Sequence, residues 1–240
     1  MLGRSILGAT LAALILPTLV LAQAPPLAQA PVPERAVINF IVPIDSNTTN
    51  LLLTIVNNQV RAGVKKITIV ISSPGGDTAS AFAAYNILKN VPAEITTFNA
   101  GNVDSAAMLI FCAGKFRYSF PNPARFLIHS NALVLGSGVP MDYNFLDNQM
   151  QQIKSLNADI VQVIAASSHK KTSEVEEMMK GQTIVSPDEA KDWGLIQDIR
   201  SNFMEPGAVF VTVNNPAPTP PSKPLEYTTI APTVSSGPTK

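Results

Sequence analysis

Strand and helix signals alternate along residues 36–212, which predicts an α/β domain built around parallel strands. Two neighbouring segments carry this prediction. Residues 65–72, KKITIVIS, form a nearly continuous run of β-branched side chains, as expected for a strand covered on both faces. Pro-Gly-Gly ends that run, and residues 78–90, TASAFAAYNILKN, follow with apolar side chains at helical spacing.

The other predicted elements continue the same alternation. Residues 186–194, SPDEAKDWG, predict a helix with Ser186 as the N-cap and Pro187 at its first position. Glu189 completes a capping box, and Gly194 ends the helix. Further strands are predicted at 36–42, 94–100, 125–130 and 195–199, and further helices from the cap residues Asp45 and Ser46 to 63 and at 105–114.

The longest predicted helix runs from Met141 to about Ser167. Its apolar residues fall at spacings of three, four and seven: Leu146, Met150, Ile153, Ile160 and Ile164. About 27 residues at ~1.5 Å each would extend ~40 Å, more than a small domain needs to cover its own sheet. We therefore expect this helix to project from the domain and to pack against another subunit.

Both ends of the chain differ in composition from the domain. Residues 1–24 have the pattern of a secretory signal: Arg4, an apolar run and an Ala-Gln-Ala cleavage site. Residues 25–35 read as a Pro/Ala-rich linker, and residues 213–240 as a disordered tail rich in Pro, Thr and Ser. The sequence thus predicts an exported protein, periplasmic or secreted, which would be membrane-anchored if the signal stays uncleaved.

Charge and cysteine content exclude several classes of function. The chain has 17 basic and 17 acidic residues with no basic run, so no nucleic-acid partner is expected. Two histidines and one cysteine make no metal-ligand set, and we expect neither a metal nor another cofactor. Cys112, in MLIFCAG, is predicted to be a buried small hydrophobe, and His169 an exposed side chain.

Three features can carry chemistry. Ser105 opens a predicted helix after a Gly-Asn turn, where a serine is either a helix cap or a nucleophile with an oxyanion hole beside it. The adjacent glycines Gly75 and Gly76 allow backbone N–H groups to face a substrate, although an ordinary turn explains them equally. His129 ends a strand, where α/β sites usually form.

In their order along the chain, these blocks resemble the proteolytic subunit of the Clp protease. The resemblance rests on VISSPGGDTASAFAAYNIL, GNVDSAAMLIFCAGKFRYSFPNPARFLIHS, the long helix and IVSPDEAKDWGLIQDI, and it spans about 36–200. It implies a Clp/crotonase-like α/β fold of repeated β-β-α/β-α units with a long projecting handle helix. It also implies self-association into rings and peptide or unfolded protein as substrate.

The same resemblance implies a catalytic site. Ser105 matches the family's nucleophile and His129, in LIHSN, matches its base. Backbone N–H groups of Gly75 or Gly76 and of Ala106 would hold the oxyanion.

Two residues depart from the family pattern. Gln182 stands where the family has its catalytic aspartate, and as a third member it would orient His129 through its carbonyl oxygen without supplying a charge. Asp104 stands before the serine, where a small residue is usual, and would either favour the helix N-terminus or repel a developing oxyanion. Acidic residues that could substitute for the aspartate are Glu176, Glu177 and Asp188.

These features leave several functions open. An exported chain would meet neither ATP nor an ATP-driven unfoldase, so the leading hypothesis is a serine endopeptidase that acts alone. The main alternative is a catalytically impaired scaffold or peptide-binding oligomer. An acyl-CoA enzyme of the crotonase branch and a Ser-Lys signal peptide peptidase fit less well, because the sequence offers neither a cationic nucleotide site nor a lysine in an obvious base position.

Overall fold

The computed structural model describes residues 33–132, 141–204 and 206–214. All of them belong to one compact unit that begins at Val32. The predicted signal lies outside the described residues, as do residues 25–32 of the linker and 215–240 of the tail. Among the described helices, none has both the length and the hydrophobicity needed to cross a membrane.

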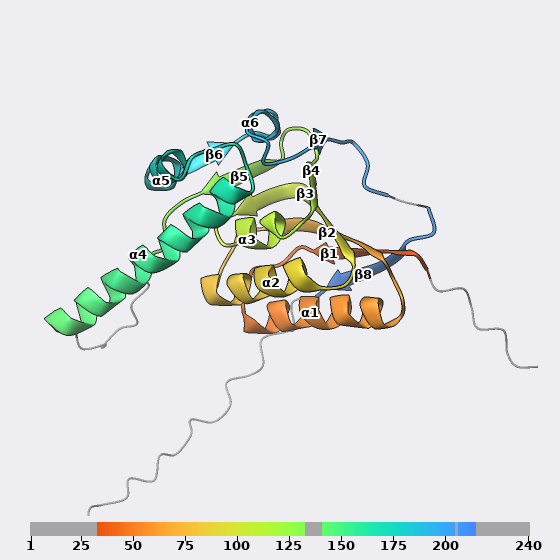
Figure 1. Ribbon diagram of the computed structural model, residues 1–240, viewed down its shortest axis with the longest axis horizontal. Helices are drawn as coiled ribbons and strands as arrows, with labels where there is room; N and C mark the ends of the chain where they lie inside the picture. Colours follow the sequence, from red (N-terminus) through yellow and green to blue (C-terminus); the bar gives the residue numbers. More distant parts are fainter. Residues whose placement is uncertain (1–32, 133–140, 205, 215–240) are drawn as a thin grey trace, which may run out of the picture. The chain divides into compact units, whose positions relative to one another are not determined.

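An eight-stranded sheet organises the described residues (Figure 1). Its strands are β1 (Arg35–Phe40), β2 (Lys66–Ser73), β3 (Glu94–Asp104), β4 (Phe116–Ser119), β5 (Arg125–Ile128), β6 (Thr183–Val185), β7 (Asp198–Ile199) and β8 (Val209–Val213). The spatial order is β6-β5-β3-β2-β1-β8, and β4 joins β3 to β7. Only β5 and β6 pair antiparallel among these strands. The predicted α/β class is therefore confirmed.

Six helices accompany the sheet in the described part of the chain. They are α1 (Ser46–Arg61), α2 (Thr78–Asn90), α3 (Ala107–Cys112), α4 (Tyr143–Ala166), α5 (Thr172–Lys180) and α6 (Pro187–Asp192). The helix signals at 46–63, 78–90 and 186–194 are confirmed, with bounds that differ by at most two residues at either end. The sequence analysis missed β4, β6, β8 and α5.

The predicted caps Asp45 and Ser186 are confirmed, whereas Ser46 is the first residue of α1 and not its cap. The carboxylate of Asp45 accepts the Thr48 N–H at 2.8 Å and starts α1. Ser186 starts α6, where Glu189 accepts the Ser186 N–H at 2.8 Å to complete the capping box. These contacts satisfy N–H groups that a helix terminus leaves without partners.

The sheet separates two apolar layers. The main core lies on the side of α1, α2 and α3, which the ribbon shows on one face of the sheet (Figure 1). A smaller cluster lies on the other face, around the buried side chains Val37, Val70 and Phe98. Phe203, from the segment between β7 and β8, packs on this cluster with its ring centroid 5.5 Å from that of Phe98. The C-terminal segment therefore closes a face that the helices leave open.

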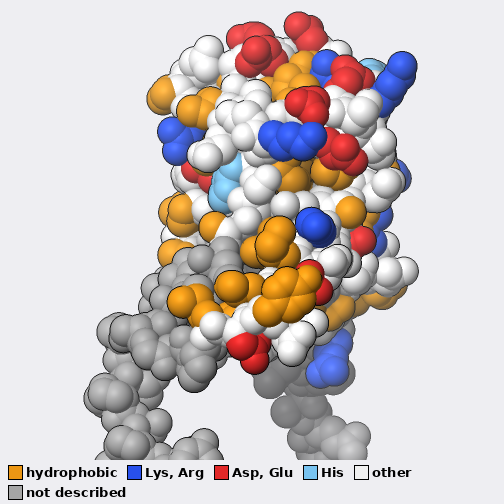
Figure 2. All heavy atoms as spheres, turned by 90° about the vertical axis from the view of Figure 1, so that its left-hand side faces the viewer, with side chains coloured by type: hydrophobic (Ala, Val, Ile, Leu, Met, Phe, Trp, Pro, Cys, Tyr) orange, Lys and Arg blue, Asp and Glu red, His pale blue; other side chains and the backbone are white. Residues whose placement is uncertain are grey.

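The long helix α4 projects from the domain, as its length predicts (Figure 1). Its buried residues, Ile160, Val161 and Ile164, all lie in the C-terminal part, which contacts α3 and α5. Leu146 and Met150 lie nearer its start and are exposed. Figure 2 looks onto this end of the domain, where hydrophobic side chains gather at the surface. The N-terminal half of α4 thus extends beyond the sheet with an uncovered apolar stripe.

Candidate active site

The end of β3 places Ser105. The first half of β3 pairs with β4, whereas residues Asn102 to Asp104 pair with β5. The pairing of β3 with β2 shifts register between Ile71 and Ser73, which marks a β-bulge. Gly101 and Asn102 lie in this bulged part of the strand, so the expectation of a Gly-Asn turn was wrong. The bulge lets one strand serve two neighbours and brings Ser105 beside the strand that leads to His129.

Ser105 sits at a sharp strand-to-helix connection. Its φ is +57°, a left-handed conformation that is uncommon for a residue with a side chain. Its N–H donates to the Leu127 carbonyl at 2.9 Å, which ties the connection to β5. The N-cap of α3 is Ala106, and no side chain caps that helix. The cap interpretation of Ser105 is therefore wrong, which leaves its strained backbone to be explained by function.

The Gly75-Gly76 turn lies directly against Ser105. Both glycines have positive φ, +86° and +146°. A Cβ on Gly75 would lie 2.7 Å from the Ser105 Cβ and 3.0 Å from the Ala106 nitrogen, distances that only glycine permits. Two segments of the chain that lie 30 residues apart in sequence thus meet at the serine, as the resemblance requires.

Two backbone N–H groups at this junction are available to a ligand. The Gly75 N–H donates to the Ser73 hydroxyl at 3.2 Å. Among the described residues, neither the N–H of Gly76 nor that of Ala106 has a hydrogen-bond partner. Gly76 is also exposed, whereas Gly75 is buried. Of the two glycines, Gly76 therefore has the amide that is free to bind an oxyanion together with Ala106.

His129 follows the last residue of β5 and is held in one tautomer. Its Nδ1 lies 2.8 Å from the carbonyl oxygen of Ser130. Because a carbonyl only accepts, Nδ1 carries the proton in the neutral ring, and Nε2 then has the free lone pair. That is the tautomer a general base needs. Within the described residues, no hydrogen bond joins His129 to Ser105 or to a carboxylate.

Gln182 and His129 flank the same pair of strands. In the antiparallel pairing of β5 with β6, Ile128 lies opposite Thr183; His129 follows Ile128 and Gln182 precedes Thr183. Gln182 is exposed and has a φ of +50°. No hydrogen bond between the two side chains is present in the part of the chain that the structure describes.

The three acidic residues that could substitute for the family's aspartate have different surroundings. Glu177 forms an ion pair with Lys180 at 2.7 Å. Asp188 lies in the first turn of α6. Glu176 lines a cavity of about 260 Å³ next to the site, together with Ser130, whose carbonyl holds His129. Of the three, Glu176 is therefore the acidic residue that shares a cavity with the segment after the histidine.

This cavity has an apolar wall and a charged rim. Ala158, Val161 and Met179 come from α4 and α5, and lysines from the same helices, Lys154 and Lys180, stand beside them. A chain of polar contacts borders it: Asn157 accepts from the N–H of Asn131, which in turn accepts from Thr78. The segment after His129 is thus connected to both α4 and the start of α2.

The Asp104 carboxylate is paired with side chains of β3 and β5. One carboxylate oxygen lies 3.0 Å from Arg125 Nη2 and 3.0 Å from Asn102 Nδ2. Asn102 in turn accepts from the Ser72 hydroxyl at 2.8 Å. The ion pair raises the pKa of the Arg125 guanidinium, first through its hydrogen bond with Asp104 and then through their charges. The carboxylate before Ser105 therefore has a counterion.

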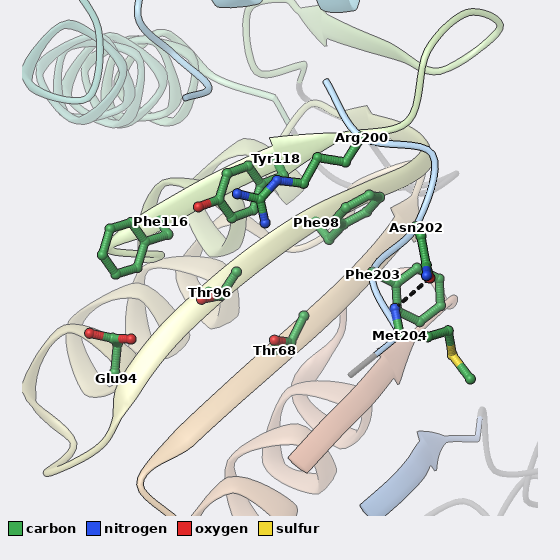
Figure 3. A pocket seen from close by; sticks show the side chains of 10 residues that line it. All are labelled: Thr68, Glu94, Thr96, Phe98, Phe116, Tyr118, Arg200, Asn202, Phe203 and Met204. Atoms are coloured by element: carbon green, nitrogen blue, oxygen red, sulfur yellow. Dashed lines mark hydrogen bonds between the residues drawn. The ribbon is translucent and has the colours of Figure 1, made fainter. Parts of the chain in front are cut away.

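A second concavity lies on the open face of the sheet and has a different character. It encloses about 310 Å³ and is lined by aromatic, threonine and C-terminal side chains (Figure 3). The Arg200 guanidinium stacks 3.4 Å from the centroid of the Tyr118 ring. Its residues include none of the predicted catalytic set, so the candidate active site is the junction around Ser105.

Two other predictions concern residues outside the site. Cys112 is buried in α3, as predicted, and burial raises the pKa of its thiol. His169 is exposed, as predicted, and its ring packs against Gly194. In the described parts of the chain no group of three potential metal ligands comes together.

Comparison with known proteins places this geometry in a family. A family model described as Clp protease matches residues 30–203, a segment that includes every element from β1 to β7. The chain belongs to the Clp protease family. The predicted resemblance is thereby confirmed, and β8 is an element that lies beyond the matched Clp protease segment.

Individual Clp proteins show the same relationship. The ATP-dependent Clp protease proteolytic subunit 2 of Borreliella burgdorferi is 31% identical over 136 residues, which cover 56% of this chain and 67% of that protein. Proteolytic subunit 1 of Thermobifida fusca is 26% identical over 169 residues, or 69% of this chain and 74% of that one. The chain spans 61% and 60% of the length of two further Clp proteolytic subunits.

A solved structure confirms the fold. A mutant of ClpP1 from Listeria monocytogenes matches 70% of this chain and 92% of its own with a TM-score of 0.62 at 21% identity. The predicted Clp/crotonase-like fold is therefore confirmed.

Sequence reasoning missed three groups at this site. The Ser130 carbonyl holds His129, the Ser73 hydroxyl holds Gly75, and Arg125 pairs with Asp104. The carbonyl has no side-chain signature at all. The arginine gave no signal either, because a half-exposed charge at the start of a strand is solvated without a partner.

Proposed function

We propose that this chain is a serine-type endopeptidase that cleaves peptides or unfolded polypeptides through an acyl-enzyme on Ser105. The observation that carries the proposal is the junction of the strained Ser105 backbone with the N–H groups of Gly76 and Ala106, which have no hydrogen-bond partner in the part of the chain that the structure describes. A strained residue beside free amides is typical of a nucleophile with its oxyanion hole. Membership in the Clp protease family supports the same reaction class.

Each residue has a step in the proposed reaction. Nε2 of His129 takes the hydroxyl proton of Ser105 as Oγ attacks the peptide carbonyl carbon. The N–H groups of Ala106 and of the glycine turn donate to the oxyanion of the tetrahedral intermediate. The imidazolium then protonates the leaving amine, and a water activated by His129 releases the acyl group and restores Ser105.

The proposed base works without a carboxylate. The Ser130 carbonyl supplies the orientation that an aspartate supplies elsewhere, because it holds the proton on Nδ1. It supplies no negative charge to stabilise the imidazolium, and Gln182 would not do so either. Where the loss of the aspartate leaves the catalytic histidine in the wrong tautomer, turnover falls by ~10⁴. Since the tautomer is retained here, we expect a slower enzyme with a smaller loss than that.

The proposal extends to assembly and location. The stripe on α4, formed by Tyr143, Leu146 and Met150, is exposed by 43–80% and supports self-association into rings through this helix. The signal at 1–24 supports export, where the enzyme would act without ATP and without an unfoldase.

Degradation of an unfolded protein tests this function. The chain from residue 25 onward is incubated with fluorescein-labelled casein without nucleotide, beside Ser105→Ala and His129→Ala. We expect peptide release by the wild type and a loss of at least 10³-fold in both variants. No release by a folded, oligomeric wild type would contradict the proposal.

A catalytically impaired scaffold is the second candidate. It is favoured by the absence, among the described residues, of a hydrogen bond between His129 and Ser105 or a carboxylate. Under this alternative the folded oligomer would bind casein without cleaving it, which equilibrium binding of the same labelled protein would detect.

A further inference from the structure

The side chain of Asp104 is buried next to the nucleophile and is only half satisfied. It is 7% exposed, and its Oδ1 has no hydrogen-bond partner in the described residues. Its Oδ2 receives both available donors, Arg125 Nη2 and Asn102 Nδ2. A buried carboxylate in this situation depends on its counterion, because removing that counterion leaves a charge that neither water nor other donors compensate.

The ion pair also joins the strand of the nucleophile to the strand of the base. Asp104 is the last residue of β3 and is followed by Ser105, while Arg125 begins β5, which leads to His129. The backbone makes the same connection where the Ser105 N–H donates to the Leu127 carbonyl. Asn99 adds a third link by donating to the Arg125 carbonyl at 2.8 Å.

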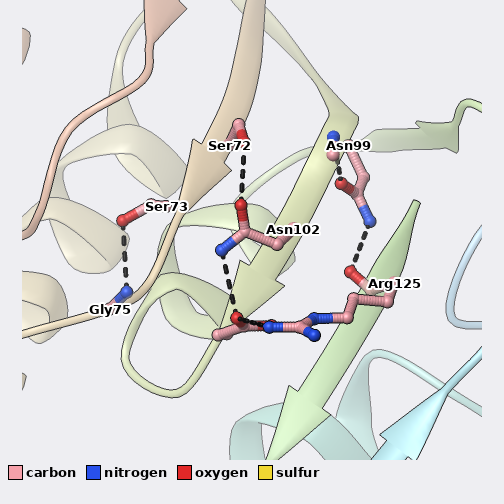
Figure 4. A network of polar contacts seen from close by, with 8 residues as sticks. Ser72, Ser73, Gly75, Asn99, Asn102 and Arg125 are labelled. Carbon is pink, nitrogen blue, oxygen red and sulfur yellow. Dashed lines mark hydrogen bonds and ion pairs between the residues drawn. The ribbon is translucent and has the colours of Figure 1, made fainter. Parts of the chain in front are cut away.

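The network also includes β2, the strand that leads into the glycine turn. Ser72, in β2, donates to Asn102, which donates to Asp104 (Figure 4). The carbonyl of Asp104 lies only 2.6 Å from where a Cβ on Gly75 would be. The position of Asp104 therefore affects both the serine and the turn that would hold the oxyanion.

We propose that Asp104 and Arg125 are a positioning pair, in which Arg125 neutralises the carboxylate beside the oxyanion and holds the end of β3 against β5. This inference rests on the proposed peptidase function. It differs from a simple stabilising ion pair because the two partners are unequal. The Arg125 side chain is 48% exposed and remains solvated when alone, whereas Asp104 without Arg125 is a buried negative charge beside the site of a developing one.

This inequality sets the expected effects. The Asp104 carboxylate and the developing oxyanion are taken to be roughly 7 Å apart, about the span between neighbouring side chains. At an effective dielectric of about 20, the repulsion between two unit charges at this distance slows a reaction by about 50-fold. Arg125→Gln should therefore slow acylation by about 50-fold. Asp104→Ala removes the charge and should slow it less than tenfold. The double variant should recover at least tenfold relative to Arg125→Gln, because no uncompensated carboxylate remains.

The experiment measures Ser105 acylation with two probes in the chain from residue 25 onward. One is a fluorophosphonate, followed as labelling rate, and the other is p-nitrophenyl acetate, followed as kcat and KM. Arg61→Gln and Asp192→Ala, both at exposed positions on helices away from the pair, are the matched controls. Circular dichroism melting gives the folded fraction, to which each rate is normalised.

The outcomes separate this inference from the function on which it rests. A wild type that neither probe acylates contradicts the proposed function itself. An acylated wild type with Arg125→Gln at the same rate, or with a double variant as slow as Arg125→Gln, overturns the positioning pair. Because the ester is neutral, we expect Arg125→Gln to lower kcat while KM changes less than threefold. An equal change in kcat and in KM would indicate only that the substitution had loosened the site.

A conservative variant covers the case in which Arg125→Gln does not fold. Arg125→Lys keeps the charge and shortens the reach, so its rate should lie within fivefold of the wild type. If a folded Arg125→Lys loses 50-fold or more, neutralisation of Asp104 is not the role of this position, and the proposal is overturned.

Discussion

Replacing Gly75 by alanine should inactivate the site while leaving most of the fold intact. The added methyl would lie 2.6 Å from the Asp104 carbonyl oxygen and 2.7 Å from the Ser105 Cβ. Both neighbours belong to a backbone that is hydrogen-bonded to β5 and cannot move away freely. Relief of the clash must therefore shift the serine, the glycine turn or both.

The magnitude follows from two contributions. Ordinary contact begins at 3.4 Å, so the backbone must yield by about 0.8 Å. A misplacement near 1 Å costs ~10² in rate when reacting groups must be aligned. The φ of +86° adds about 1–2 kcal/mol of backbone strain for a residue with a Cβ. We expect acylation to fall by ~10² or more and the free energy of unfolding by about 1–3 kcal/mol.

Gly207→Ala is the matched control for this experiment. Gly207 also has a positive φ, +78°, but a Cβ there would meet none of the described residues within 4 Å. It should therefore show the strain without the loss of activity. Fluorophosphonate labelling measures acylation, and urea unfolding measures stability. If Gly75→Ala labels as fast as Gly207→Ala, the glycine turn does not form the oxyanion hole, and the reasoning above is refuted.

Three further predictions concern parts of the fold outside the reacting groups. Because burial raises the pKa of the Cys112 thiol, it should resist 5,5′-dithiobis(2-nitrobenzoate) in the folded chain and react in guanidinium; rapid reaction when folded would contradict its placement. Hydrogen bonds from Ser186 lower the pKa of Glu189. Glu189→Gln should therefore lower the free energy of unfolding at pH values above the ordinary glutamate pKa, and the difference from the wild type should vanish as pH falls through the lowered pKa. An equal effect at pH 7 and pH 3 in urea titrations would contradict this. Phe203→Ala should lower the free energy of unfolding by about 2–3 kcal/mol through lost packing on Phe98, and Phe210→Ala, an exposed control, by less than about 0.5 kcal/mol; equal losses would contradict the role of the C-terminal segment.

The sequence predicted those elements whose formation depends on residues close to one another in the chain. The β-branched run in β2 and the capping box at Ser186 each depend on residues within a few positions of one another. The four-residue strand β4, FRYS, has only one buried residue and no alternation long enough to recognise. Its place is decided by β3 and β7, which are distant in sequence.

The site required contacts that no local pattern contains. Gly101 and Asn102 have the composition of a turn, yet they lie in a strand: Asn102 pairs with Arg125 of β5, and its side chain accepts from Ser72, 30 residues earlier. The sequence allowed Asp104 to repel a developing oxyanion, and only the structure shows that Arg125 of β5 is its counterion. The order of Ser105 and His129 could be read from the chain, but the group that orients the histidine is a main-chain carbonyl and leaves no trace in it.

Peptide mapping after acylation tests the central claim most directly. The chain from residue 25 onward is treated with a fluorophosphonate, digested and analysed by mass spectrometry, beside Ser105→Ala and His129→Ala. We predict one adduct per chain on Ser105, none in Ser105→Ala, and labelling at least 10³-fold slower in His129→Ala. A folded wild type without an adduct, or with its adduct on another residue, would contradict the account.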